Sequence, residues 1–274
     1  VNADILRLMG VVNGTGGNQF NPGDTLTRAQ FCTMAVRFLQ REDEAARYAT
    51  RTIFSDVSSG HWARSYVNLA ASTSVGEGDN VQPLISGVGD GRFLPDNSIN
   101  LAESVTILLR ILGYTGKEAG AVWPQGYLDL AKSVGLTDGV SAGTYDSITR
   151  AQAAQLFVNA LKCKTAKGDV YYKSLGTVSS DKAIILAVNV TTDDGSRTGA
   201  VRTTNNSASE AYLPAHGEGN PVALQGKRGD LVLNDREEIV VFVPDDSSAV
   251  TVTLSGDAQA AYLKAAGGQQ YTVS

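Results

Sequence analysis

Residues 87–103 read GVGDGRFLPDNSINLAE and decide the fold of the first part of the chain. The stretch is a glycine-rich loop followed by a polar quartet, and an apolar run continues after the quartet. Asn100 is a favoured N-cap, and Glu103 three residues later completes a capping box. The stretch therefore predicts a loop, in which Gly89 and Gly91 supply turn geometry, and a helix that begins at the quartet.

The same pattern occurs twice more. Residues 14–39 and 139–161 each contain a loop that starts with glycine, a polar quartet and an apolar helical run in matching register. Their quartets supply capping boxes of the same kind through Thr27, Gln30, Thr149 and Gln152. The apolar positions of each run fall on one stripe of a helix. One repeat cannot bury such a stripe alone, so three copies should close around a shared core.

A further helix is expected before each loop, ending at a glycine. In the second and third copies this helix carries Trp62 and Trp123, each four residues before a tyrosine. The second copy alone has an insertion at about residues 77–84. The sequence thus predicts a helical domain over residues 1–167, with repeats at about 1–48, 49–115 and 116–167, the first of them incomplete at its N-terminus.

After residue 167 the periodicity changes from helical to extended. Short runs rich in Val, Ile, Thr and Tyr alternate with turn signals, which predicts a small antiparallel β barrel or sandwich over residues 168–274. We predict strands at 170–178, 183–191, 199–204, 210–213, 230–233, 238–243, 249–254 and 271–273, and one helix at 257–266. The acidic turns at 193–194 and 245–246 are interpreted as solvated turns, with calcium bridging as a minority alternative. The fold class expected is therefore α+β with several domains.

The composition of the chain argues against several classes of function. The chain has 274 residues and a formal net charge of −5, which suits about two domains and argues against a broad nucleic-acid surface. It has two His and two Cys, without the spacings typical of zinc sites, so neither a metal nor a cofactor is expected. No apolar run is long enough for membrane insertion. Cys32 and Cys163 differ by nine residues in repeat register and are predicted to be buried free thiols.

The second copy resembles the S-layer homology (SLH) domain family in several motifs. It carries Phe-Ser-Asp-Val at 54–57, His-Trp-Ala at 61–63 and Gly-Asp-Gly-Arg-Phe-Leu-Pro-Asp at 89–96. The quartet at 100–103 stands where the family has Thr-Arg-Ala-Glu, and the other copies have Thr-Arg-Ala-Gln. The resemblance covers about residues 1–165 and does not extend to the remainder.

The resemblance implies a helical domain with pseudo-threefold symmetry at a bacterial cell surface. Such domains hold their proteins noncovalently to a secondary cell-wall polysaccharide, which lies in grooves between neighbouring repeats and often ends in a pyruvylated amino sugar. A chain that begins at Val1 without a signal pattern is then expected to be processed or trimmed, and secreted to the cell wall.

Two arginines are the best candidates for contacts to such an anion. Arg28 and Arg150 lie in the first turn of their helices, where a cation opposes the helix dipole at a cost of about 0.3–1 kcal/mol. A guanidinium beside free helix N–H groups does, however, suit a carboxylate. We favour this role over a structural ion pair. The second copy has Leu101 at this position, so its groove should bind poorly unless Arg92 substitutes.

The other candidates have structural alternatives. Trp62 and Trp123 suit either core packing or a sugar face. Asp56 could hold a turn, although the family places this residue at the ligand. The loop from 89 to 92, with Gly89, Asp90, Gly91 and Arg92, serves turn geometry or close approach to a sugar. The residues Thr27, Gln30, Asn100, Glu103, Thr149 and Gln152 are interpreted as helix caps near the site.

Non-catalytic anchoring to an anionic wall polysaccharide is the leading functional hypothesis, because no catalytic constellation is present in the sequence. One alternative is a main S-layer subunit that assembles through the β domain into a homo-oligomer or lattice. The other is an anchor fragment of a larger wall hydrolase.

Overall fold

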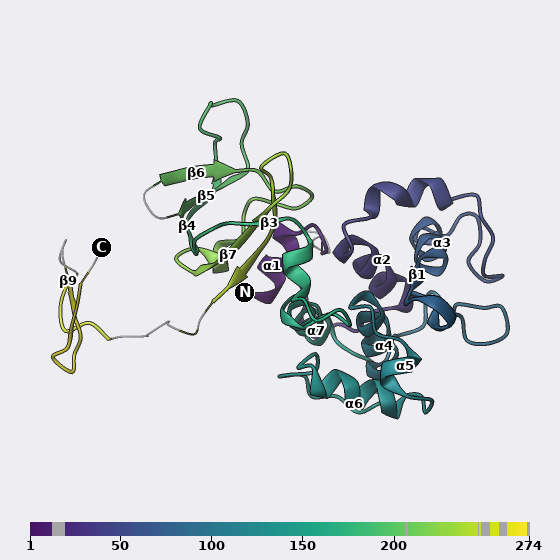
Figure 1. Ribbon diagram of the computed structural model, residues 1–274. Helices are drawn as coiled ribbons and strands as arrows, with labels where there is room; N and C mark the ends of the chain where they lie inside the picture. Colours follow the sequence, from purple (N-terminus) through teal and green to yellow (C-terminus); the bar gives the residue numbers. More distant parts are fainter. Residues whose placement is uncertain (13–19, 206–207, 246, 248–252, 258–261, 273–274) are drawn as a thin grey trace. The chain divides into compact units, whose positions relative to one another are not determined.

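The computed structural model describes residues 1–12, 20–205, 208–245, 247, 253–257 and 262–272. The chain divides into two compact units, residues 1–244 and 245–274, which we describe separately. The first unit contains both helices and an antiparallel sheet, so the chain is an α+β protein (Figure 1). The division at residue 167 that the repeats predict falls inside this unit and stays a prediction.

The quartet helices begin where the capping boxes predict. In each, the side chain of the cap residue (Thr27, Asn100 or Thr149) accepts a hydrogen bond from the third N–H of the helix, and the Gln or Glu at that position accepts one from the cap N–H. These helices are α2 (Arg28–Phe38), α4 (Leu101–Ile111) and α7 (Arg150–Lys162). The helices before the loops are α1 (Asn2–Leu8), α3 (Arg64–Ser72) and α6 (Gln125–Ser133), and α5 (Gly116–Ala119) is a single turn.

A closed ring of backbone hydrogen bonds joins the residues that precede the quartets. The N–H of Ile99 donates to the carbonyl of Leu26 (3.0 Å), that of Ile148 donates to Ile99 (3.1 Å), and that of Leu26 donates to Ile148 (3.3 Å). All three side chains are buried. Residues from all three predicted copies therefore meet at one point.

Each quartet helix is also bonded to the loop of another copy. The first N–H groups of a helix have no partner within the helix and must find one elsewhere. In α2, the N–H groups of Arg28 and Ala29 donate to the carbonyls of Asn97 and Pro95 (both 2.9 Å). Helix α4 bonds in the same way to the third loop and α7 to the first, through the pairs Leu101–Asp146, Ala102–Thr144, Arg150–Asp24 and Ala151–Pro22. The exchange is cyclic, because each quartet helix is bonded to the loop of the following copy and the third helix to the loop of the first.

The core of the first unit runs from the helices into the sheet without a break. Phe157 packs against Phe31 and Phe38, with ring centroids 5.0 and 5.1 Å apart, and Phe38 stacks on Tyr171 at 5.1 Å. Helix α1 packs against both α7 and a strand of the sheet, β8 (Ile239–Pro244). The helical and β-rich segments thus share buried aromatic and aliphatic contacts.

The sheet is antiparallel and curls on itself. Strand β7 (Arg228–Leu233) pairs with β8 on one edge, and with β3 (Thr177–Val178) and β4 (Ala183–Val190) on the other. Strands β5 (Ala200–Asn205) and β6 (Ala208–Tyr212) extend the sheet beyond β4. The segment after β6 returns to β8, where Ile239 exchanges hydrogen bonds with Leu213 and Ala215. The result is a partly closed, half-barrel sheet.

The strand predictions are confirmed in their main positions but not everywhere. The strand predicted at 170–178 is wrong over most of its length, because Tyr171–Ser174 forms a 3₁₀ turn that buries both tyrosines. Further 3₁₀ turns occupy Glu42–Tyr48, Gly78–Asn80 and Val222–Leu224. The insertion of the second copy is a short hairpin of β1 (Ser74–Val75) and β2 (Gln82–Pro83).

The second unit contains a hairpin of β9 (Tyr262–Lys264) and β10 (Gln270–Thr272). The helix predicted at 257–266 is therefore wrong over its later residues: the turn at Gly267–Gly268, where Gly268 has a φ of +85°, lets the chain reverse and pair with itself. Most of the strand predicted at 249–254, the first part of that helix and the last residue of the strand predicted at 271–273 lie outside the described residues.

Among the described helices, none combines the length and the apolar character needed to cross a bilayer. The longest, α7, has 13 residues. No span of the kind that a membrane-embedded helix requires is therefore present in the described part of the chain.

Both cysteines are buried and free, as predicted. Burial raises the pKa of Cys32 to about 12 and that of Cys163 to about 11. Because the thiolate is the reactive form, Ellman's reagent at pH 8 should label neither thiol in the folded protein and both after unfolding in guanidinium. Rapid labelling of the native chain would contradict this expectation.

Candidate ligand-binding grooves

Two grooves lie between predicted repeats, and each is lined by an exposed tryptophan. The Trp62 side chain is 57% exposed and lines a groove of about 510 Å³, which we call the Trp62 groove. The Trp123 side chain is 50% exposed and lines a groove of about 540 Å³, the Trp123 groove. These exposures disfavour the core-packing interpretation of both indoles.

The walls of the two grooves come from matching repeat positions. A stripe of the quartet helix, α2 or α4, forms one wall, and an arginine from another copy joins it. The matched pairs are Leu26 and Ile99, Gln30 and Glu103, Thr33 and Thr106, Met34 and Ile107, Arg37 and Arg110, Trp62 and Trp123, and Arg150 and Arg28. Equivalent positions of the predicted repeats therefore line both grooves.

Arg28 is held tightly in the wall of the Trp123 groove. It is 7% exposed, and its Nη1 forms an ion pair with the carboxylate of Glu103 at 2.6 Å. Its Nε donates to the carbonyl of Phe93 (2.7 Å) and its Nη2 to that of Ser86 (3.4 Å), while the guanidinium lies 4.7 Å from the centroid of the Phe93 ring. All three guanidinium nitrogens thus have acceptors within the protein.

Arg150 has fewer partners in the Trp62 groove. Its Nε donates to the carbonyl of Phe20 (2.7 Å), and its guanidinium lies 5.1 Å from the centroid of that ring. Within the described parts of the chain no carboxylate forms an ion pair with it. Burial lowers the pKa of Arg150, and the charge of Asp24 opposes this effect. A partly buried cation without an ion pair is the kind of group that a carboxylate ligand would stabilise.

Each groove has a second arginine, which lies on the quartet helix two turns after the Gln or Glu of the quartet. In the Trp62 groove, Arg37 forms an ion pair with Glu42 at 2.8 Å and lies 5.7 Å from the centroid of the Tyr66 ring. In the Trp123 groove, Arg110 bonds only to neutral acceptors: its Nη1 donates to the carbonyl of Pro83 (3.0 Å) and to the hydroxyl of Ser86 (3.2 Å). The Nε of Arg110 is buried and has no partner among the described residues.

Of Asp56 and the loop residues 89–92, only Gly89 lines one of the two grooves. Asp56 holds the second loop, since its carboxylate accepts hydrogen bonds from the N–H groups of Phe93 and Leu94 (2.8 and 2.7 Å). Gly89 lines the Trp123 groove, whereas Asp90 and Arg92 pair with each other in solvent, and the side-chain hydrogen bond from Arg92 lowers the pKa of Asp90. Gly91 has a φ of +78°, which accounts for glycine at that turn.

The position of Leu101 also differs from its counterparts. Arg28 and Arg150 each cover the aromatic ring of a neighbouring loop, Phe93 and Phe20. Leu101 is 7% exposed, and the aromatic residue of the corresponding loop, Tyr145, is 66% exposed. The third interface between copies therefore lacks the arginine and aromatic pair of the other two.

Sequence reasoning did not single out Arg37 and Arg110. Both lie seven residues after the Gln or Glu of the quartet, which is two turns along the same face of the helix. The recurrence of arginine in equivalent register at residues 37 and 110 was the available signal.

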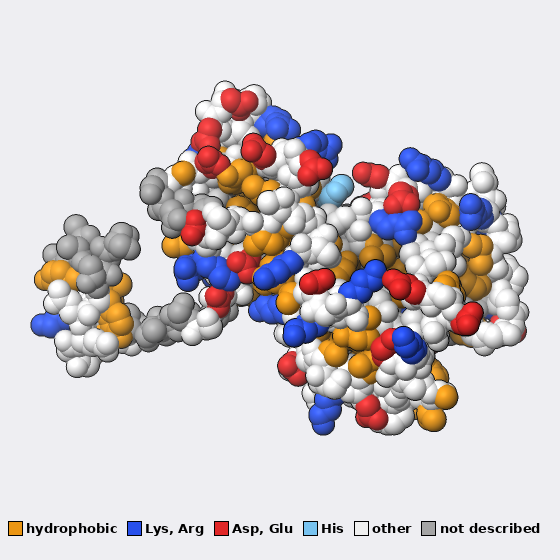
Figure 2. Space-filling view, viewed as in Figure 1, with side chains coloured by type: hydrophobic (Ala, Val, Ile, Leu, Met, Phe, Trp, Pro, Cys, Tyr) orange, Lys and Arg blue, Asp and Glu red, His pale blue; other side chains and the backbone are white. Residues whose placement is uncertain are grey.

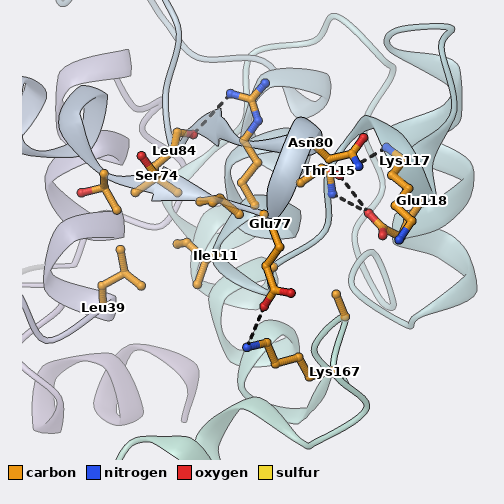
Figure 3. Close-up of a pocket in the computed structure, with 16 residues that line it drawn as sticks. Leu39, Ser74, Glu77, Asn80, Leu84, Ile111, Thr115, Lys117, Glu118 and Lys167 are labelled. Carbon is orange, nitrogen blue, oxygen red and sulfur yellow. Dashed lines mark hydrogen bonds and ion pairs between the residues drawn. The ribbon is translucent and has the colours of Figure 1, made fainter.

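A further cavity of about 430 Å³ adjoins the insertion of the second copy (Figure 3). One wall is the segment from Ser74 to Leu84, and the other is formed by the end of α4 and by α5. Figure 3 shows Glu77 directed at Lys167, with which it forms an ion pair at 3.1 Å, and Glu118 bonded to Thr115. Arg110 lines this cavity as well as the Trp123 groove.

The surface of the first unit carries both signs of charge. On the face shown in Figure 2, Lys and Arg side chains are interspersed with Asp and Glu. No group of three or more His, Cys, Asp or Glu side chains in the described segments is arranged to hold a metal ion. On this face, positive charge is therefore mixed with negative charge and is not gathered into one basic patch.

Comparisons with known proteins relate the chain to proteins of the bacterial cell surface. The model of the S-layer homology domain family matches residues 9–32. The "Surface layer protein" of Brevibacillus choshinensis is 28% identical over 276 residues, 92% of this chain and 23% of the relative. The "Cell surface protein" of Thermoanaerobacter kivui is 31% identical, over 59% of this chain and 20% of the relative. The "Cellulosome-anchoring protein" of Acetivibrio thermocellus is 26% identical, over 58% of this chain and 37% of the relative.

Together these matches define a protein of the cell surface. More particularly, residues 9–32 match the S-layer homology domain, and the motifs of the second copy resemble the same family. The chain spans between about a fifth and two fifths of the length of these relatives.

Proposed function

We propose that residues 1–167 form three SLH repeats around a pseudo-threefold axis and anchor the protein noncovalently to an anionic secondary cell-wall polysaccharide. The ring of hydrogen bonds through Leu26, Ile99 and Ile148 supports the symmetric arrangement. So does the cyclic bonding of each quartet helix to another copy's loop.

The observation that carries the proposal is the pair of matched grooves. Each combines an exposed indole, which can cover a sugar ring, with guanidinium groups that can bind a carboxylate. A pyruvate ketal on an amino sugar supplies both the ring and the carboxylate. Trp62 and Arg150 contribute to one such site, and Trp123 and Gly89 contribute to the other.

The role is binding rather than catalysis. The grooves contain guanidinium, hydroxyl and indole groups, but no paired carboxylates of the kind that cleave glycosidic bonds. An anchor of a larger wall enzyme is a weaker proposal, since it would need residues beyond those described.

A second candidate function is that of a main S-layer subunit that assembles through its β-rich part. It is favoured by one observation: the likeness to the Brevibacillus choshinensis surface layer protein covers 92% of this chain and so includes the β-rich part. Concentration-dependent two-dimensional arrays, seen by electron microscopy, would support this function in addition to anchoring.

Sedimentation with purified cell walls tests the anchor. The protein should co-sediment with walls that retain their secondary polysaccharide, and more than about 90% of the bound protein should be lost after hydrofluoric acid removes that polymer. Acid-treated walls that bind as much protein as untreated walls would contradict the proposal. A variant with both indoles replaced, Trp62→Ala with Trp123→Ala, should bind untreated walls at least about tenfold more weakly.

A further inference from the structure

Resting on the proposed function, we infer that the two grooves recognise a carboxylate at opposite ends: Arg150 binds it in the Trp62 groove, whereas Arg110, and not Arg28, binds it in the Trp123 groove. The inference depends on which guanidinium in each groove already has a carboxylate partner within the protein.

Each groove is lined by two arginines at matching positions, and one of the two in each groove forms an ion pair with a carboxylate of the protein. In the Trp62 groove the paired arginine is Arg37, because Glu42 bonds both its Nη2 (2.8 Å) and its Nε (2.9 Å). This leaves Arg150 without an ion pair among the described residues. The free positive charge is therefore near the start of helix α2, beside Gln30.

In the Trp123 groove the pairing is reversed. Glu103 stands at the position of Gln30 and neutralises Arg28 at 2.6 Å. Arg110 stands at the position of Arg37 but has no counterpart of Glu42, and its Nη1 is held by carbonyls of the insertion, Pro83 and Leu84. Neutral acceptors orient this guanidinium without neutralising it, and its buried Nε has no partner among the described residues.

The two ends of a groove, at the quartet position and at the second arginine, are far enough apart to change the orientation of a bound ligand. Seven residues lie between the quartet position and the second arginine, which is about 10 Å along the helix axis at ~1.5 Å per residue. This distance exceeds the width of one sugar ring. A ligand that places its ring on the indole must therefore turn its carboxylate in opposite directions in the two grooves.

The chain offers a direct test because it contains only two tryptophans, one in each groove. In ¹⁵N-labelled protein each indole N–H gives one signal, and Trp62→Phe and Trp123→Phe assign the two signals. The probe is the methyl glycoside of N-acetylmannosamine bearing a 4,6-linked pyruvate ketal, and the methyl ester of that ketal is its uncharged control.

The acid probe should shift both indole signals, and the ester should bind at least about tenfold more weakly. Arg150→Gln should weaken the titration of the Trp62 signal by at least about tenfold and leave that of Trp123 unchanged. Arg110→Gln should do the reverse. In each variant the unaffected indole shows that the protein remains folded, and Lys132→Gln on the exposed face of α6 is a matched control.

A reciprocal exchange at the quartets tests the cause. Gln30→Glu should place a carboxylate beside Arg150 and lower the affinity of the Trp62 groove for the acid probe. Glu103→Gln should free Arg28 and raise the affinity of the Trp123 groove for the acid probe severalfold. Both changes keep a capping side chain at that position, since Gln and Glu each fill it in this chain.

The outcomes separate the two proposals. If the acid probe shifts neither indole, the proposed ligand class is wrong and the inference fails with it. If both signals respond to the acid probe but Arg110→Gln leaves the Trp123 titration unchanged, the inference is overturned while the anchoring function stands.

Discussion

Replacing Phe157 by alanine should lower the free energy of unfolding of the first unit by about 3–5 kcal/mol. The Phe157 side chain has no solvent exposure and lies between two rings of α2, with centroid distances of 5.0 Å to Phe31 and 5.1 Å to Phe38. Its removal would leave a cavity beneath Phe38, which stacks in turn on Tyr171. Helices and sheet should therefore lose stability together.

Urea unfolding followed by circular dichroism measures the change. Tyr145→Ala is the matched control, because this aromatic side chain is 66% exposed and its removal should change the free energy of unfolding by less than about 0.5 kcal/mol. Equal changes in the free energy of unfolding for the two substitutions would show that packing of Phe157 in the aromatic cluster does not stabilise the core.

The local features of the fold could be predicted from the sequence because they depend on residues close in the chain. The caps at Asn100 and Thr149 need only a side chain and an N–H three residues apart, and the structure confirms them. The positive φ of Gly91 follows in the same way from a short loop.

Contacts between distant residues could not be predicted in this way. The Nη1 of Arg28 meets Glu103 across 75 positions, and no periodicity within one copy indicates that pairing. The sequence presents Arg28 as a cation near unsatisfied N–H groups, whereas the structure shows those N–H groups bonded to Asn97 and Pro95. The ligand role of Arg28 stays a prediction, and its structural role is now visible.

The errors in secondary structure have physical causes of the same kind. Tyr171 and Tyr172 have strand propensity, but burial of Tyr171 against Phe38 favours a compact turn over an extended strand. Residues 262–264 contain good helix formers, yet they pair with 270–272 across a glycine turn. In both cases tertiary contacts outweigh a modest local preference.

Arg28→Leu is the second substitution with a large expected effect, at about 2–4 kcal/mol of lost stability. Leucine is the residue that this chain itself has at the equivalent position 101, so a helix start tolerates it. At position 28, however, it would leave the carboxylate of Glu103, 23% exposed, without its cation, and the buried carbonyl of Phe93 without a donor.

The double variant Arg28→Leu with Glu103→Gln should recover about 1–2 kcal/mol of that loss, because the partly buried carboxylate is then absent and Gln still caps α4. Urea unfolding of the parent, the two single variants and the double variant gives the coupling free energy. Arg92→Leu is the control, since the ion pair of Arg92 with Asp90 lies in solvent and should contribute nothing measurable. If the stability lost in the double variant equals the sum of the losses in the two single variants, Arg28 and Glu103 do not stabilise each other. Glu103 would then not prevent Arg28 from binding the carboxylate of a ligand.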